Sequence, residues 1–173
     1  MKLTPLTKQF VLHWGEMGTR WGINRTVAQV HALLFISPKP LHAEEIVGLL
    51  SVARSNVSTS LKELQNWGLV KVVHVLGDRR DHFETHKDVW ALFQIILRER
   101  KRREVDPTVA LLRQAVAETK GEGKDDEYAR EQLAKMLEFF ETATECYEDV
   151  GKLSPATLRK LMKMGGKVGT LLR

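Results

Sequence analysis

Residues 53–70, ARSNVSTSLKELQNWGLV, constrain the fold more than any other part of the sequence. Val57, Leu61 and Leu64 recur at helical spacing and predict a buried stripe, and Gly68 predicts the end of that helix. The opposite face is polar throughout and carries Arg54, Ser55, Asn56, Ser58, Thr59 and Lys62. The segment therefore predicts a helix with one face in a core and the other face available to a partner.

The flanking segments predict a helix before this one and a β-hairpin after it. Residues 41–50 form a short helix with acids in its first turn, and we expect Ser51 to cap the helix that follows. Residues 69–76 are rich in β-branched side chains, which favours a strand. Residues 77–81, GDRRD, indicate a turn, and residues 82–86 indicate the returning strand. Two helices at a tight turn, followed by a hairpin, make a helix-turn-helix with a wing.

Helical patterns also occupy both ends of the chain. We expect helices at 6–17, 25–37, 87–107, 108–118 and 128–150, and a last one from Ser154-Pro155. Two glycines in 18–24 interrupt the first pattern, Pro107 breaks or kinks the long helix, and 119–127 is a flexible charged connection. The predicted fold class is mainly α with a small β-hairpin wing: a winged helix-turn-helix plus a helical dimerisation region.

We divide the chain into three parts by these patterns. Residues 1–24 form an N-terminal dimerisation helix, 25–90 a winged helix-turn-helix DNA-binding domain, and 91–173 a helical region for dimerisation or effector binding. Two separate winged-helix copies on two DNA half-sites would bind more tightly than one, which favours a homodimer.

Composition limits the class of protein. The 173 residues are 43% hydrophobic and 28% charged, as in an ordinary globular protein, and their net charge is +5. Positive charge concentrates in 1–37 and 91–124, which permits nucleic acid as a partner without requiring it. The sequence has no run of about 18 apolar residues, and its first residues lack the apolar core of a signal peptide. We therefore expect a cytoplasmic protein with no membrane segment.

The two-faced helix has the side chains that DNA recognition needs. A helix fits the major groove, where arginine and asparagine make bidentate contacts with bases. Arg54 could pair with a guanine and Asn56 with an adenine, and the sequence leaves both assignments open. In the hairpin, Arg79 and Arg80 suit the DNA backbone or the minor groove, with the flanking aspartates orienting them. The alternatives are a solvated helix face and an exposed turn with weak ion pairs.

The order of these segments resembles the MarR family of winged-helix regulators, and within it the repressors that control glycine betaine synthesis and choline import. The matching segments are MGTRWGINRTVAQVHALLFIS, ARSNVSTSLKELQNWGLVKVV, GDRRDHFE and RERKRREVDP, which lie between residues 17 and 107. The resemblance implies a homodimer on an inverted-repeat operator, a repressor, and choline or a related quaternary amine as effector. The acidic C-terminal third matches only loosely.

Aromatic residues provide candidates for the effector site. Quaternary ammonium groups bind aromatic faces, so we consider a cage formed by Trp14, Trp21, Trp90 and Phe93. Aromatic residues at helical spacing also pack in cores, which is the competing interpretation. The basic run RERKRRE at 98–104 has two roles open to it, contact with phosphates or ion pairs with acids of ECYEDV; we favour the second.

Other functions have weaker signals. His74, His82 and His86 flank the hairpin, but HFETH lacks the helical zinc motif, and we predict no catalytic residue, metal or cofactor. Cys146 is the only cysteine, which excludes an internal disulfide, and the acids around it oppose a reactive thiolate. The remaining alternative is a winged helix that docks proteins, or an architectural DNA-binding module, without a small-molecule effector.

Overall fold

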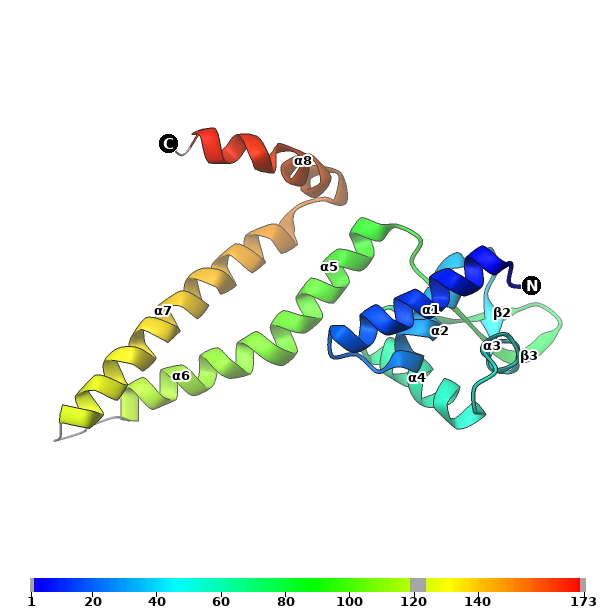
Figure 1. Cartoon of the computed structure of the whole chain (residues 1–173), viewed down its shortest axis with the longest axis horizontal. Helices are drawn as coiled ribbons and strands as arrows, with labels where there is room; N and C mark the ends of the chain where they lie inside the picture. The colour runs from blue at the N-terminus through cyan, green and yellow to red at the C-terminus, as the bar shows by residue number, and fades with distance from the viewer. Residues whose placement is uncertain (1, 119–123, 172–173) are drawn as a thin grey trace. The chain divides into compact units, whose positions relative to one another are not determined.

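The computed structural model describes residues 2–118 and 124–171, with side chains at 2–118 and 126–165. The chain divides into two compact units, Met1–Leu92 and Phe93–Arg173, and each is described by itself. Helices α1 to α4 and the strands belong to the first unit (Figure 1). Their bounds are α1 Pro5–Arg20, α2 Arg25–Ile36, β1 Leu41–His42, α3 Ala43–Leu50, α4 Arg54–Asn66, β2 Val70–Val75 and β3 Asp78–Thr85.

The sheet is small and antiparallel, with strand order β1-β3-β2. β3 lies between the other two strands, so Leu41 pairs with Phe83 on one side and Val72 pairs with Phe83 on the other. Helix α2, the short strand β1, the α3–α4 pair and the β2–β3 hairpin make a winged helix-turn-helix. The predicted fold class, mainly α with a small hairpin wing, is confirmed.

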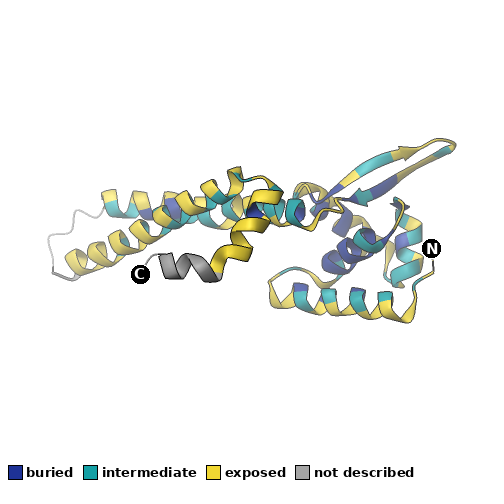
Figure 2. Cartoon of the chain, turned by 90° about the horizontal axis from the view of Figure 1, so that it is seen from above, coloured by how far each residue is buried: buried dark blue, intermediate teal, exposed yellow. Residues whose placement is uncertain are grey.

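Helix α2 forms the centre of the first unit. Val30, Leu33 and Leu34 are almost completely buried, and Figure 2 shows the buried residues gathered inside this unit. α1 packs on α2 through Gly15 and Gly18, where side chains would collide with α2. The predicted end of this helix at residue 17 was wrong, and α1 continues to Arg20. Gly18 does not interrupt the helix, because it lies within it and provides the space in which α1 approaches α2.

A buried polar network joins β3 to α2. Thr85 Oγ1 donates to the Leu69 carbonyl at 2.7 Å, so it accepts from His31 Nε2 at 3.2 Å. This arrangement requires a proton on Nε2 of His31. Burial, reinforced by the charge of Lys87, lowers the pKa of His31 to about 4. The Lys87 ammonium in turn donates to the carbonyls of Leu34, Phe35 and Ser37 at the end of α2.

The α3–α4 turn differs from the prediction at one residue. Ser51 does not cap α4: it ends α3 in the left-handed conformation, with φ 53°. The N-cap of α4 is Ala53, which has no side-chain oxygen to offer. The predicted stop at Gly68 is confirmed, because Gly68 has φ 67° and the Leu69 N–H donates to the Leu64 carbonyl at 2.9 Å.

The hairpin reverses earlier than predicted. The turn was expected over 77–81, but β3 already begins at Asp78, and Gly77 with φ 85° makes the reversal possible. Val73 pairs with His82 and Val75 pairs with Asp78, so β3 has extra residues there and the ladder is bulged. Arg79 and Arg80 therefore lie on a bulged strand near the tip rather than in a turn. Residues 41–42, predicted as helix, form β1 instead.

The second unit is helical. It contains most of α5 Val89–Arg100, a π-turn η1 Lys101–Val105, α6 Asp106–Glu118, α7 Lys124–Lys152 and α8 Pro155–Leu171. Pro107 does not break the helix, since η1 precedes it and the Asp106 N–H reaches back to the Lys101 carbonyl. The predicted connection at 119–127 lies outside the described residues at 119–123, and 124–127 belong to α7. The predicted last helix, capped by Ser154, is confirmed.

Few described side chains of the second unit are buried. α6 packs against α7, the buried residues of α6 are Val109 and Leu112, and α8 buries Leu158. The stripe predicted on α7, with Leu133, Leu137, Phe140 and Tyr147, is only half-buried. No helix in the described part of the chain is long and apolar enough to cross a membrane.

Candidate nucleic-acid interface

Helix α4 has the two faces that its sequence predicts. Val57, Ser60, Leu61 and Leu64 are buried, and all six predicted contact residues are exposed. These six side chains are Arg54, Ser55, Asn56, Ser58, Thr59 and Lys62. They occupy the N-terminal two thirds of α4, the part of a recognition helix that reaches base edges in known helix-turn-helix complexes.

The N-terminus of α4 is open. Ala53 provides no side-chain cap, and the first turn has no acidic residue. The first N–H groups of a helix have no partner within it, and the helix dipole is positive at this end. Both features favour an anionic partner such as a phosphate.

Arg54 is the first residue of α4, and its side chain is 76% exposed. Its Nη2 lies 2.9 Å from Oε1 of Glu44, which is in the first turn of α3. The other oxygen of Glu44 lies 3.1 Å from Nδ1 of His42. The pKa of Glu44 lies below its usual range, through its own backbone hydrogen bond first and the His42 side chain second. Glu44 is therefore an ionised partner of Arg54.

In the wing, one of the two arginines, Arg80, forms an ion pair with Asp78. Asp78 accepts from Nε of Arg80 at 2.9 Å and from the Arg80 backbone N–H at 3.0 Å. The Arg80 side chain holds the pKa of Asp78 far below its usual range, and Asp78 raises the pKa of Arg80. The predicted orientation of an arginine by Asp78 is confirmed for Arg80. Arg79 is exposed and has no ion pair within the described part of the chain.

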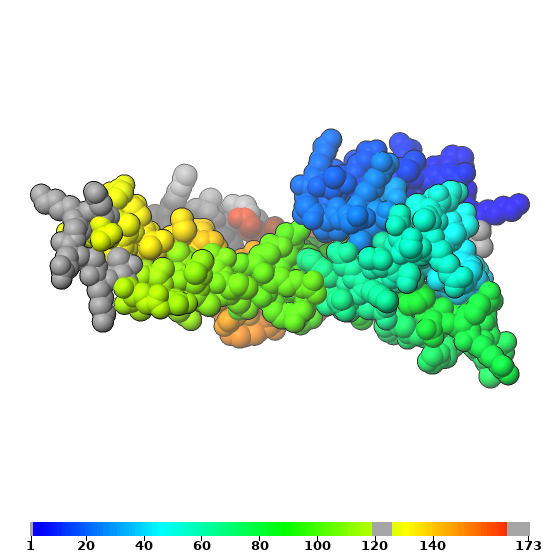
Figure 3. Space-filling view, turned by 90° about the horizontal axis from the view of Figure 1, so that it is seen from below, coloured from blue at the N-terminus to red at the C-terminus, as the bar shows by residue number. Residues whose placement is uncertain are grey.

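The carboxylates of the two ion pairs, Arg54–Glu44 and Arg80–Asp78, each lie beside a histidine. His42 on β1 pairs with His82 on β3, and their rings are 5.5 Å apart at 87°. His82 Nε2 lies 3.6 Å from Oδ2 of Asp78. Figure 3 shows the hairpin projecting from the body of the first unit. His42 was not singled out from the sequence, and Glu44 was assigned only to the helix dipole. The spacing of two residues between His42 and Glu44 does not by itself indicate the contact between their side chains.

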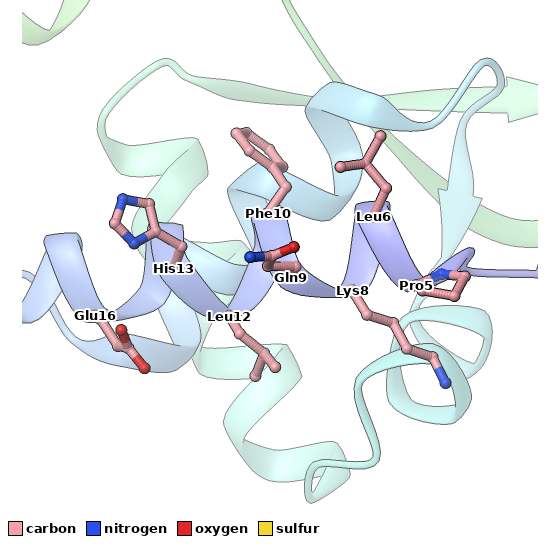
Figure 4. Close-up of a pocket in the computed structure, with 8 residues that line it drawn as sticks. All are labelled: Pro5, Leu6, Lys8, Gln9, Phe10, Leu12, His13 and Glu16. Atoms are coloured by element: carbon pink, nitrogen blue, oxygen red, sulfur yellow. The ribbon is translucent and has the colours of Figure 1, made fainter.

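The structure brings two of the four residues of the predicted aromatic cage into contact, Trp14 and Trp21. Trp14 and Trp21 are 5.8 Å apart with their rings at 88°, and Phe10 lies 5.6 Å from Trp14. Trp90 and Phe93 lie about one turn apart on α5, where Trp90 is half-buried and Phe93 is exposed. None of the four predicted ligand residues lines the open pocket of about 800 Å³ on α1, which involves Leu6, Phe10 and Leu12 among others (Figure 4).

The basic run at 98–104 is mostly ion-paired within the second unit. Arg102 and Arg103 contact Glu99, and Arg100 contacts Glu104. Lys101 bridges Asp106 at 2.8 Å and Glu148 on α7 at 3.4 Å. The Asp106 side chain, followed by Glu148, raises the pKa of Lys101. The preferred interpretation of this run, ion pairs with acids of ECYEDV, is therefore confirmed for Lys101.

Other chemistry finds little support in the described residues. They contain no cluster of three or more histidine, cysteine, aspartate or glutamate side chains arranged to hold a metal ion. His82 is buried while His74 and His86 are exposed, so the hairpin histidines do not share one environment. Cys146 is exposed and unpaired with another cysteine.

Comparison with known proteins agrees with this geometry. Residues 21–81 match the MarR family. The match spans α2, the helix-turn-helix and the start of the wing. A solved structure described as a transcriptional regulator is similar in fold, with a TM-score of 0.64 and 20% sequence identity. The similarity covers 85% of this chain and 96% of that one. No curated protein matches the sequence. The matched segment, residues 21–81, includes every residue predicted to contact DNA.

Proposed function

We propose that this chain is a sequence-specific DNA-binding transcription regulator that acts as a homodimer. α4 enters the major groove, and the wing places Arg79 and Arg80 beside it. The observation that carries the proposal is the exposure of all six polar residues on one face of α4 above a buried face. The MarR match over 21–81 and the winged-helix fold support a regulator rather than an enzyme.

The second unit supports the homodimer. Only three apolar residues are buried in the described part of this unit, while several large apolar side chains are exposed on α6, α7 and α8. These include Leu111, Tyr128, Met136, Phe139, Leu161, Met162 and Met164. Apolar residues on this scale are normally covered, and a second copy of the same helices would cover them. Two copies also present two recognition helices to the two halves of an inverted repeat.

The dimer has its own test. Phe139 is 67% exposed and meets the half-buried Phe140 edge to face at 5.6 Å, so we expect Phe139→Lys to leave the monomer folded. We expect the substitution to raise the dimer dissociation constant about tenfold or more, as sedimentation over a concentration series would show. Exposed Lys135→Ala, one turn earlier on α7, is the control. A Phe139→Lys protein that dimerises as the unchanged protein does would place the interface elsewhere.

The main experiment is selection from a random pool of duplex DNA at near-physiological salt. We expect an enriched inverted repeat with half-sites about ten base pairs apart, matching one turn of DNA between two recognition helices. Affinity for the selected site should fall steeply as salt rises, because phosphate contacts release counterions. Enrichment of no sequence would overturn the proposal and favour a protein-docking or architectural module.

Substitutions on the two faces separate recognition from folding. Arg54→Ala should cost about 1–3 kcal/mol on the selected site and less on unrelated duplexes. Gln65→Ala, also exposed but near the C-terminal end of α4, is the matched control and should change neither affinity. An equal loss on all sequences would make Arg54 a phosphate contact rather than a base contact.

The finer proposal is a repressor of the choline and glycine betaine type, with a quaternary amine as effector. The right-angled pair of Trp14 and Trp21, half-exposed on and after α1, supports such a site. Choline should release the selected DNA, and Trp14→Leu should weaken that response while DNA binding without choline is kept. Release by choline that is unaffected by Trp14→Leu would place the effector elsewhere, and no release would remove choline as the effector.

A further inference from the structure

Arg54 stands where a helix does not favour a cation. It is the first residue of α4, at the positive end of the helix dipole, and the first turn of α4 contains no acid to offset its charge. Its long side chain is 76% exposed, which would normally leave it free to sample many rotamers. Instead, its guanidinium lies 2.9 Å from Glu44, an acid supplied by the preceding helix.

Glu44 is itself fixed. Each of its carboxylate oxygens has its own partner, Oε1 with Arg54 and Oε2 with Nδ1 of His42 at 3.1 Å. The His42 side chain is only 12% exposed, and its backbone is paired with β3. The direction of Arg54 is therefore set from the sheet, through His42 and Glu44, although its own helix does nothing to hold it.

The same chain of contacts reaches the wing. His42 meets His82 edge to face at 5.5 Å, His82 lies 3.6 Å from Asp78, and Asp78 holds Arg80. Arg54 on the helix and Arg80 on the hairpin are thus each held by a carboxylate, and the two carboxylates are joined through one pair of histidines. The connection between Arg54 and Arg80 is not evident from the sequence, because the two residues belong to different elements.

We infer that Glu44 and His42 are positioning residues for DNA recognition and that Glu44 lowers affinity for DNA in general while raising discrimination between sequences. The inference rests on the proposed function. A carboxylate beside the interface repels phosphates, so it weakens binding to every sequence. A guanidinium held in one direction loses less freedom when it binds a base edge, so binding to the correct site is favoured over loose phosphate contact.

The test compares the selected operator with an unrelated duplex of equal length. Glu44→Ala should bind the unrelated duplex more tightly, with a salt slope steeper by up to about 0.9. Its operator-to-unrelated affinity ratio should fall about 3- to 10-fold, which is the range expected for one long side chain that is no longer held in place. A purely structural role for Glu44 would lower both affinities together instead.

Three further variants separate charge from orientation. Glu44→Gln removes the charge but keeps an oxygen for Arg54, so it should gain general affinity while keeping more of the affinity ratio. Glu63→Ala on α4 changes the net charge equally without touching Arg54 and should leave the ratio unchanged. His42→Asn replaces the imidazole Nδ1–H that donates to Glu44 with a shorter side chain, so the ratio should fall. An unchanged ratio in His42→Asn would remove His42 from the proposal.

A double-mutant cycle decides between positioning and an independent effect. In an Arg54→Ala background, Glu44→Ala should cause no further loss of discrimination. Additive losses would overturn the positioning role while leaving the proposed regulator intact. Operator binding that does not depend on Arg54 would do the same. Failure to enrich any operator would instead end the proposed function, and the inference with it. If Glu44→Ala does not fold, Glu44→Gln carries the same cycle.

Discussion

The two units of this chain bury their side chains very differently. In the first unit, α2 alone contributes eight buried residues, and buried residues from the strands and from α1, α3 and α4 surround it. In the second unit, α7 is the longest helix of the described chain, with 29 residues, and none of its described residues is fully buried. The first unit has a core of its own, whereas the second unit has surfaces that require a partner.

The difference between the units is tested most strongly by truncating one side chain in each of them. Leu33→Ala empties a completely buried position on α2 and should cost about 2–5 kcal/mol of unfolding free energy. Leu111→Ala on α6, which is 65% exposed, should change it by no more than about 0.5 kcal/mol. Urea unfolding of both variants, measured at low protein concentration, checks the difference. Equal losses would mean that Leu111 is covered as completely as Leu33 even at low protein concentration.

Low pH should loosen the first unit through His31. Its pKa is about 4 in the folded chain and near 6.5 when unfolded, so the unfolded state binds the extra proton between these values. The corresponding stabilisation, about 3 kcal/mol, is complete above pH 6.5 and is lost as the pH falls toward 4. His31→Gln, whose amide can still donate to Thr85, should flatten this part of the stability profile. His74→Gln, at an exposed histidine outside this network, is the matched control.

Substitution of two glycines by alanine should give smaller effects of opposite sign, because Gly18 lies in the α1–α2 contact and Gly48 does not. A Cβ at Gly18 would lie 2.5 Å from the Cβ of Ala28, so Gly18→Ala should cost about 1–3 kcal/mol. Gly48 in α3 has open space around it, and Gly48→Ala should gain about 0.5–1 kcal/mol by favouring helix. Thermal unfolding of the two variants should move in opposite directions. A loss at both positions would mean that Gly48 has a role that its surroundings do not show.

The smallest effect is expected on the second unit's surface. Arg113 on α6 and Glu141 on α7 form an exposed pair with an Nη2–Oε1 distance of 2.7 Å. Exposed ion pairs typically contribute about 0–1 kcal/mol, so Arg113→Ala should scarcely change stability. A cost above about 1.5 kcal/mol, measured by urea unfolding, would show that this pair is covered in the assembled protein.

Sequence reasoning succeeded where local patterns dictate the structure. The α4 stripe of Val57, Leu61 and Leu64, the Gly68 stop and the Ser154 cap all follow from neighbours in sequence. It erred where one residue served a different element. Ser51 was assigned to the helix after it but ends the helix before it, because its backbone takes the left-handed conformation.

The remaining errors arose from long-range pairing. β1 is only two residues long and exists because β3 lies beside it, which nothing at residues 41–42 indicates. The contact of Glu44 with Arg54 likewise depends on how α3 crosses α4. The predicted contacts of α4 and the wing with DNA, and the aromatic effector site, stay predictions until a ligand is bound.

The π-turn at Lys101–Val105 has a geometric consequence for the long helix. A π-turn contains one residue more than the α-helical turn it replaces, so every side chain after it is rotated by about 100° relative to an uninterrupted helix. Deleting one residue between 101 and 105 would return α6 to the phase of α5 and rotate its buried side chains, Val109 and Leu112, out of their present positions. In an alignment, such a deletion would look like a minor gap, yet it would change which side of α6 faces α7.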